Sequence, residues 1–248
     1  MKPAAACLAA AISLTVTSGA AYCADVSRID ILGFSPDAKV FAFEEYGVQD
    51  GSGFPYSTIF VIDTVKDAYL PGTPYRVILN DDEADGALPP VSEARARSAK
   101  AAQALLETYQ IAENPGFLAA FNPVSEIGPP DDEISYYTIQ LDRPITGAYT
   151  LKLDQVAFST PERCQGLSDQ FGGFKLRFTQ QDGKPTDATV YADTRVPESR
   201  GCVGGYRLGG VALSDTDTSL HMALVQVRSF GFEGYDLRWI AVPVRTLH

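Results

Sequence analysis

The sequence predicts a mainly β fold of antiparallel sheets with one α-helix. Two stretches, residues 29–63 and about 207–244, each contain three apolar strands joined by turns, which is the layout of one propeller blade. Between them, residues 134–193 alternate apolar and polar side chains, and one alanine-rich helix is expected at about residues 92–111. We therefore expect a single mainly β domain over residues 25–248, with propeller-blade-like units at both ends.

The first 24 residues have the features of a secretory signal peptide. Lys2 precedes an apolar run from Ala4 to Val16, and small residues follow at positions 18–21. The run is too short for a membrane span, and no later stretch has the roughly 20 apolar residues that a span needs. We expect residues 1–24 to be removed and the protein to be secreted or periplasmic.

Cys23 leaves the cleavage position open. Cleavage after Ala21 would keep Cys23 on the mature chain, whereas cleavage after Cys23 or Ala24 would remove it. A lipid anchor on Cys23 is disfavoured because Tyr22 occupies the position where lipoproteins carry a small residue.

The charge balance limits the classes of partner. The chain has a net charge of −11, which becomes −12 when Lys2 is removed, and a pI near 4.6. General binding to nucleic acid or anionic membranes needs clustered Lys and Arg, so both are disfavoured. The acidic surface favours solubility of an exported protein; cation binding or a basic partner is the alternative.

Removal of residues 1–24 leaves two cysteines, Cys164 and Cys202. In an oxidising compartment two cysteines 38 positions apart most simply form a disulfide. Such a loop closure stabilises a fold by roughly 3–4 kcal/mol on the chain-entropy model. A redox or metal role is disfavoured because the chain has no Cys-x-x-Cys and neither cysteine has a histidine nearby in sequence.

Each end unit has a turn and a glycine-aromatic loop between its strands. In the first unit, Pro and Asp favour a tight turn before the second strand. Its expected parts are strand Ile29–Phe34, turn Ser35–Asp37, strand Val40–Glu45, loop Gly47–Tyr56 and strand Ile59–Ile62. The C-terminal unit has strand Val211–Ser214, turn Asp215–Asp217, strand Leu220–Val227, loop Ser229–Tyr235 and strand Leu237–Val244. We expect the two units to be neighbours in one sheet or in a ring closed by the termini.

The expected helix begins at Ser92, which can cap it, and stops before Asn114-Pro115-Gly116. Its apolar side is mostly small, which predicts close packing on a sheet; it consists of Ala94, Ala101, Leu105 and Tyr109. Its basic residues are interpreted as a solvated face; they are Arg95, Arg97 and Lys100.

Between the helix and the C-terminal unit, two half-buried strands are expected at residues 149–154 and 174–179, with a hairpin signal at Asp182-Gly183. Residues 196–205, which include Cys202, are expected to be irregular.

The first unit resembles a TolB-type or WD40-like propeller repeat, through Ser35-Pro36-Asp37, Val40–Phe43 and the strand Ile59–Asp63. A wider resemblance includes GFSPDAKVFAFEEYGVQDGSGFPYS, the alanine-rich helix, Ser199–Cys202 and FGFEGYDLRWIAV. Through these segments the chain is similar to a domain-of-unknown-function family of predicted secreted bacterial proteins. This resemblance implies export and a shared fold, and it implies no catalytic residue.

The two glycine-aromatic loops are the best candidates for a binding site. One contains Phe54 and Tyr56, and the other contains Phe230, Phe232 and Tyr235. Aromatic side chains with polar tips suit carbohydrate or protein surfaces. The alternative is that these rings cover the end of the core.

Catalysis is poorly supported. The chain has no Gly-x-Ser-x-Gly elbow, and His221 lies in a predicted apolar strand, which favours a packed core histidine. Glu44 and Glu45 are adjacent in a strand and point to opposite faces, so a hydrolase would need Glu44 together with another acid such as Asp50 or Glu233.

No cofactor and no metal site is assigned. The best calcium candidate, with Asp81, Glu83, Asp85 and Gly86 at positions 1, 3, 5 and 6, has Ser92 at the bidentate position 12 and Glu93 one residue late. Asp215-Thr216-Asp217 is a weaker candidate.

The sequence thus favours an exported non-catalytic binding or scaffolding protein of the bacterial cell envelope, with an envelope protein or glycan as partner. The alternatives are a carboxylate-dependent hydrolase of an envelope polymer and a calcium-dependent extracellular module.

Overall fold

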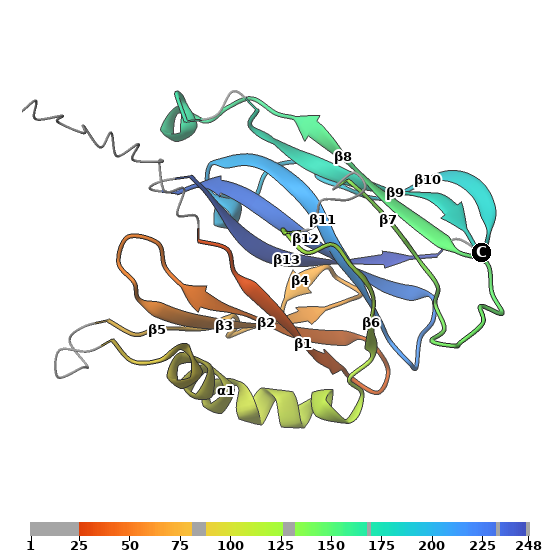
Figure 1. Cartoon of the computed structure of the whole chain (residues 1–248), viewed down its shortest axis with the longest axis horizontal. Helices are drawn as coiled ribbons and strands as arrows, with labels where there is room; N and C mark the ends of the chain where they lie inside the picture. The colour runs from red at the N-terminus through yellow and green to blue at the C-terminus, as the bar shows by residue number, and fades with distance from the viewer. Residues whose placement is uncertain (1–24, 81–87, 126–131, 168–169, 232–233, 247–248) are drawn as a thin grey trace, which may run out of the picture.

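A computed structural model describes residues 25–80, 88–125, 132–167, 170–231 and 234–246. In this part of the chain, four layers stack in the order helix, first sheet, middle sheet and third sheet (Figure 1). The prediction of a mainly β fold of antiparallel sheets with one α-helix is confirmed.

The first sheet is formed by the N-terminal unit. Its strands are β1 (Arg28–Phe34), β2 (Val40–Val48), β3 (Pro55–Asp63), β4 (Ala68–Tyr69) and β5 (Tyr75–Ile78). They pair in the order β1-β2-β3, and both β4 and β5 pair with the far edge of β3. The turn between β1 and β2 is held by Ser35, whose hydroxyl donates to Asp37 and accepts from the Val40 amide.

The middle sheet joins the C-terminal unit to one earlier strand. Its order is β13 (Tyr235–Arg245), β12 (Leu220–Phe230), β11 (Val203–Leu213) and β6 (Phe117–Phe121). The strand expected at Val211 therefore begins eight residues earlier, so the expectation of an irregular 203–205 segment is wrong. Register shifts at Gly205 and Gly210 let the long strand pass these glycines.

The third sheet has the order β10 (Lys184–Ala192), β9 (Gly172–Gln181), β8 (Tyr149–Ala157) and β7 (Glu133–Tyr136). The predicted hairpin between β9 and β10 is confirmed. Asp182 and Gly183 both have positive φ, 48° and 75°, as the two-residue hairpin turn requires. Short 3-10 helices lie at Ile111–Glu113 (η2), Glu162–Cys164 (η3) and Glu198–Arg200 (η4).

The helix α1 spans Val91–Thr108 and lies on the outer face of the first sheet (Figure 1). Pro90, not Ser92, is its N-cap, and the helix ends before Gln110, which adopts a left-handed conformation. Its buried residues are small, as expected, but they are Ala94, Ser98 and Ala102, while Ala101 is exposed.

The interpretation of Arg95 as part of a solvated face is wrong. Arg95 reaches the first sheet, where its guanidinium donates to both carboxylate oxygens of Glu44 and binds Asp30 at 2.5 Å. Its guanidinium also lies 3.9 Å from the ring centroid of Tyr46. Because Glu44 is buried, this ion pair joins the helix to the sheet.

The middle sheet is buried on both faces. Toward the first sheet it packs Met222, Leu224 and Trp239 against phenylalanines of β1 and β2. Toward the third sheet it packs Leu208, Val225 and Val242 against residues of β8 and β9. The two end units therefore stack face to face in separate sheets and are not neighbours in one sheet as expected. The described strands form three stacked sheets, so the propeller resemblance is not confirmed.

His221 is a packed core residue, as the sequence predicts. It is 0% exposed, and the aromatic rings of Tyr136, Tyr149 and Phe178 surround it edge-on. Its Nε2 faces the Thr218 carbonyl at 3.2 Å, so Nε2 carries the proton and Nδ1 accepts from the Tyr136 hydroxyl at 2.7 Å. Burial lowers the pKa of His221 from 6.5 to about 4.

This lowered pKa predicts a loss of stability in mild acid. Below pH 6.5 the unfolded chain protonates His221 while the folded protein does not until about pH 4. Stability is complete above pH 6.5 and falls by about 3 kcal/mol as the pH drops toward 4. Urea unfolding of the wild type and of His221→Gln between pH 7 and 5 should show a shallower pH dependence in the variant. Parallel curves would contradict the assignment.

Candidate functional site: a cleft between the first and middle sheets

A cavity of about 760 Å³ lies between the inner face of the first sheet and β13, the edge strand of the middle sheet. Its walls come from the inner face of the first sheet, from β13 with the end of β12, and from the segment after β10. We call it the inter-sheet cleft. Segments distant in sequence, from β2 to β13, meet in it.

The first wall is the face of β3 and β5 that points to the middle sheet. Alternate residues of β3 line it, namely Tyr56, Thr58, Phe60 and Ile62, and Arg76 and Ile78 continue it on β5. Tyr69 on β4 stacks on Phe60 with ring centroids 5.5 Å apart and is 41% exposed. This wall therefore presents accessible aromatic and aliphatic surface, with the exposed Arg76 at its rim.

The second wall is the edge of β13. Five consecutive residues, Arg238–Val242, line the cleft. Since successive side chains of a strand point to opposite faces, a run of five means that the cleft follows the backbone edge and not one face.

The third wall is a segment held by the disulfide. Cys164 and Cys202 are bonded, as predicted, and this ties η3 to the segment that follows β10. Within it, Arg200 donates to Asp193 at 2.6 Å and to the hydroxyls of Tyr191 and Tyr206. Because the Arg200 and Asp193 side chains are only 8% and 3% exposed, their ion pair fixes this wall against the third sheet.

Glu45 lies at the base of the cleft. Its side chain extends from β2 toward the middle sheet and accepts a hydrogen bond from the Trp239 backbone amide at 2.9 Å. Burial raises the pKa of Glu45, and Arg238 opposes this rise. At this position of the β13 edge, the Glu45 carboxylate accepts the amide hydrogen bond that the carbonyl of a paired strand would otherwise accept.

A buried polar cluster joins the two sheets at one end of the cleft. The Tyr56 hydroxyl lies 2.7 Å from the Ser27 hydroxyl and donates to Asp25 at 2.9 Å. Arg238 donates to Ser27, to Asp25 and to the Tyr56 hydroxyl, and its guanidinium lies over the Tyr56 ring. Burial raises the pKa of Tyr56 above its usual value, so Tyr56 stays protonated and donates.

The aromatic residues of the two loops predicted to bind are only partly brought together. Tyr56 lines the cleft but is buried in the polar cluster. Phe54 is half-buried and Tyr235 is 39% exposed, and neither lines the cleft. Phe232 lies outside the described residues. Phe230, from the same predicted loop, does line the cleft and packs on Tyr235 with ring centroids 4.8 Å apart.

Sequence reasoning missed most of the cleft: Tyr69, Arg76, Arg200 and the β13 edge. Arg200 had one signal, because it lies in the Ser199–Cys202 segment that carries the family resemblance. The β13 edge had the same signal, because Arg238–Val242 lie in the FGFEGYDLRWIAV segment of that resemblance. Tyr69 and Arg76 belong to no motif.

The paired glutamates point to opposite faces, as predicted. Glu44 faces α1 and is bound by Arg95 and by the Ser57 hydroxyl, whereas Glu45 faces the cleft. Asp50, a suggested partner of Glu44, is in the β2–β3 loop, and Glu233 lies outside the described residues. The hydrolase hypothesis therefore gains no support at Glu44.

Within the described ranges, no group of three His, Cys, Asp or Glu side chains is placed to hold a metal ion. The calcium candidate Asp81–Gly86 lies outside the described residues. In the second calcium candidate, Asp215-Thr216-Asp217, the Asp217 carboxylate accepts hydrogen bonds from Arg245 and Ser219. No helix in the part of the chain that the structure describes is long and apolar enough to cross a membrane.

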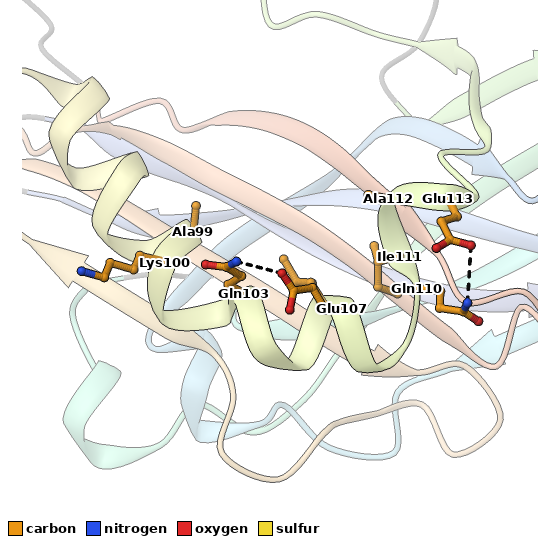
Figure 2. A pocket seen from close by; sticks show the side chains of 9 residues that line it. Ala99, Lys100, Gln103, Glu107, Gln110, Ile111, Ala112 and Glu113 are labelled. Atoms are coloured by element: carbon orange, nitrogen blue, oxygen red, sulfur yellow. Dashed lines mark hydrogen bonds between the residues drawn. The ribbon is translucent and has the colours of Figure 1, made fainter.

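A second cavity of about 560 Å³ lies along the C-terminal half of α1 and η2 (Figure 2). Most of its lining is exposed. Four of its polar side chains are hydrogen-bonded in pairs, Gln103 with Glu107 and Gln110 with Glu113. It has one wall of helix surface and no converging polar groups, so we favour the inter-sheet cleft as the functional site.

A family model described as "Predicted secreted protein (DUF2259)" matches residues 42–245. The chain therefore belongs to this family, and the expected secreted or periplasmic location is confirmed. No curated protein and no solved structure gives a significant match.

The polar cluster predicts that Tyr56→Phe destabilises the fold. The change removes a buried hydroxyl with three partners and should cost about 1–3 kcal/mol, a loss of several degrees in Tm. Tyr235→Phe is the matched control, because its hydroxyl makes no hydrogen bond to the described residues, and its Tm should be nearly unchanged. Equal melting of both variants would show that the cluster contributes little.

Proposed function

We propose that this member of a secreted family is a non-catalytic binding or scaffolding protein of the bacterial cell envelope, and that the inter-sheet cleft is its binding site. The observation that carries the proposal is a cleft of about 760 Å³ whose lining combines aromatic and aliphatic residues with charged groups such as Glu45, Arg76 and Arg200, bounded by three separately anchored elements. This size and composition are typical of ligand sites.

The walls support binding without a large rearrangement. The first sheet is held by α1 through the Glu44–Arg95 ion pair, β13 by its full pairing with β12, and the third wall by the disulfide and Arg200. Each wall is thus held separately, the first by an ion pair, the second by strand pairing, and the third by a disulfide and an ion pair. A preformed site costs less conformational entropy when the ligand binds.

The runner-up is a carboxylate-dependent hydrolase of an envelope polymer. In this structure it would use Glu45 and Asp67, since both line the cleft and burial raises the pKa of each. A raised pKa suits a general acid. Loss of polymer turnover in Glu45→Gln, with Glu44→Gln unaffected, would favour this alternative.

The binding proposal predicts a specific pattern of mutational loss. Tyr69→Ala with Arg76→Ala should reduce recovery of a crosslinked envelope partner by about fivefold or more, because both side chains are exposed in the cleft and exposed aromatic and Arg residues dominate binding energies. Quantitative mass spectrometry after co-purification measures the loss. The melting temperature should change little.

Tyr137→Ala is the matched control, since Tyr137 is 43% exposed, close to the 41% of Tyr69, but lies after β7 and does not line the cleft. Its recovery of the partner should equal that of the wild type. The cleft would be rejected as the binding site if partner recovery fell equally in the Tyr69/Arg76 variant and in Tyr137→Ala, or if it did not fall in the Tyr69/Arg76 variant.

A further inference from the structure

The edge of β13 is only partly paired. Leu237 uses both of its outward backbone groups, because its carbonyl accepts from the Ser27 amide at 3.1 Å and its amide donates to the Asp25 carbonyl at 2.9 Å. Since outward groups alternate along a strand, the same edge is formed by Trp239, Ala241 and Pro243. The Trp239 amide is already taken by Glu45.

Inside the cleft, three backbone groups of this edge have no partner among the residues that the structure describes. They are the Trp239 carbonyl and the amide and carbonyl of Ala241. Ala241 is only 7% exposed and lines the cleft. Buried backbone amides and carbonyls are almost always hydrogen-bonded in proteins, so this edge is a row of donors and acceptors that lacks its partner strand.

The protein's own N-terminal segment already shows the pairing mode. Asp25–Ser27 runs parallel to β13 and bonds to Leu237 as a short added strand. It leaves β13 at Arg28 to enter β1, so it contacts the Trp239 indole through the Ser27 carbonyl but does not pair with the backbone of Trp239 or Ala241. A second strand can continue where this segment departs.

We propose that the inter-sheet cleft binds an extended peptide segment, which adds as a strand to the edge of β13 at Trp239 and Ala241. This inference rests on the proposed function and names its ligand class. The backbone of the peptide supplies the missing donor and acceptors, and strand addition to an exposed sheet edge is a common mode of peptide recognition.

The walls define the side chains of that peptide. Alternate residues of an added strand point to opposite sides. One set faces the exposed apolar surface of Tyr69 and Ile78 and takes apolar side chains. At the rim, Arg76 makes no ion pair or hydrogen bond to the described residues, so an acidic residue of the peptide fits beside it.

Pro243 limits the length of the pairing. Its position faces outward, where it costs no bond to β12, and it has no amide to offer to an added strand. Pairing is thereby confined to the cleft, which also prevents further edge-to-edge association of β13.

The test uses the purified exported protein and a phage-displayed library of random dodecapeptides. Selected sequences are synthesised, and their affinities are measured by calorimetry. Ala241→Pro removes the free amide without touching the pairing to β12, and it should weaken peptide binding by about tenfold or more. Ala241→Gly, which keeps the amide, is the matched control and should bind nearly as well as the wild type.

A second readout does not depend on how the proline variant folds. In the wild type, NMR hydrogen exchange of the Ala241 amide should slow at least about tenfold when the peptide saturates the protein, because a protected amide exchanges only on opening. Unchanged exchange at Ala241, or equal affinities of the Pro and Gly variants, would overturn strand addition.

The outcomes separate the two proposals. Peptides that bind and lose affinity with both Tyr69→Ala and Ala241→Pro support both. No enriched peptide, together with binding of envelope glycan fragments that Tyr69→Ala weakens, overturns the peptide inference and keeps the cleft. Peptides that bind with no effect of either variant place the site elsewhere and overturn both.

Discussion

The rest of the structure depends on burying both faces of the middle sheet. In β11 and β12 nearly every residue from Tyr206 to Leu213 and from Leu220 to Val227 is buried, so neither face can meet water. A sheet with two apolar faces needs a cover on each side. The N-terminal unit, which precedes β6 in sequence, covers one face, and β7–β10, which lie between β6 and β11 in sequence, cover the other.

The cleft is a consequence of how the first cover is placed. The phenylalanines of β1, β2 and β3 pack on β12 and β13, while β4 and β5, on the far side of β3, line the cleft beside the β13 edge. The surface beside the cleft still carries alternate apolar residues because it belongs to the same face of the sheet. Burial of the core therefore leaves an apolar surface of the first sheet beside the unpaired edge of β13. The disulfide-bound segment forms the third wall of the cleft between them.

Local patterns explain what the sequence could predict. The strands, the Asp182-Gly183 hairpin, the cystine Cys164–Cys202 and the packed His221 each depend on neighbours in the chain or on a single pair. The opposite directions of Glu44 and Glu45 follow from strand geometry alone. These features need no knowledge of how the sheets are stacked.

The cleft could not be predicted because it depends on the lateral offset between two sheets. Tyr69, Arg200 and Ala241 have no relation along the chain until that offset is known. The same offset explains why Tyr56 is buried in an ion-pair cluster although it adjoins a glycine-rich loop. The ion pair of Arg95 could not be predicted for a related reason, since its buried partner Glu44 lies 51 positions away in sequence.

The β13 edge shows how stability and function can share one element. Open edges invite uncontrolled association, and proteins usually block them along their whole length. Here residues 25–27 of the chain pair with one end of the β13 edge, and the Glu45 carboxylate accepts the Trp239 amide. At the other end, Pro243 has no amide to offer. Among the residues that the structure describes, Trp239 and Ala241 keep backbone groups without a partner inside the cleft. A fold that restricts this edge on both sides of the cleft, yet leaves unpaired the part enclosed by three anchored walls, has the arrangement expected of a selective strand-binding site.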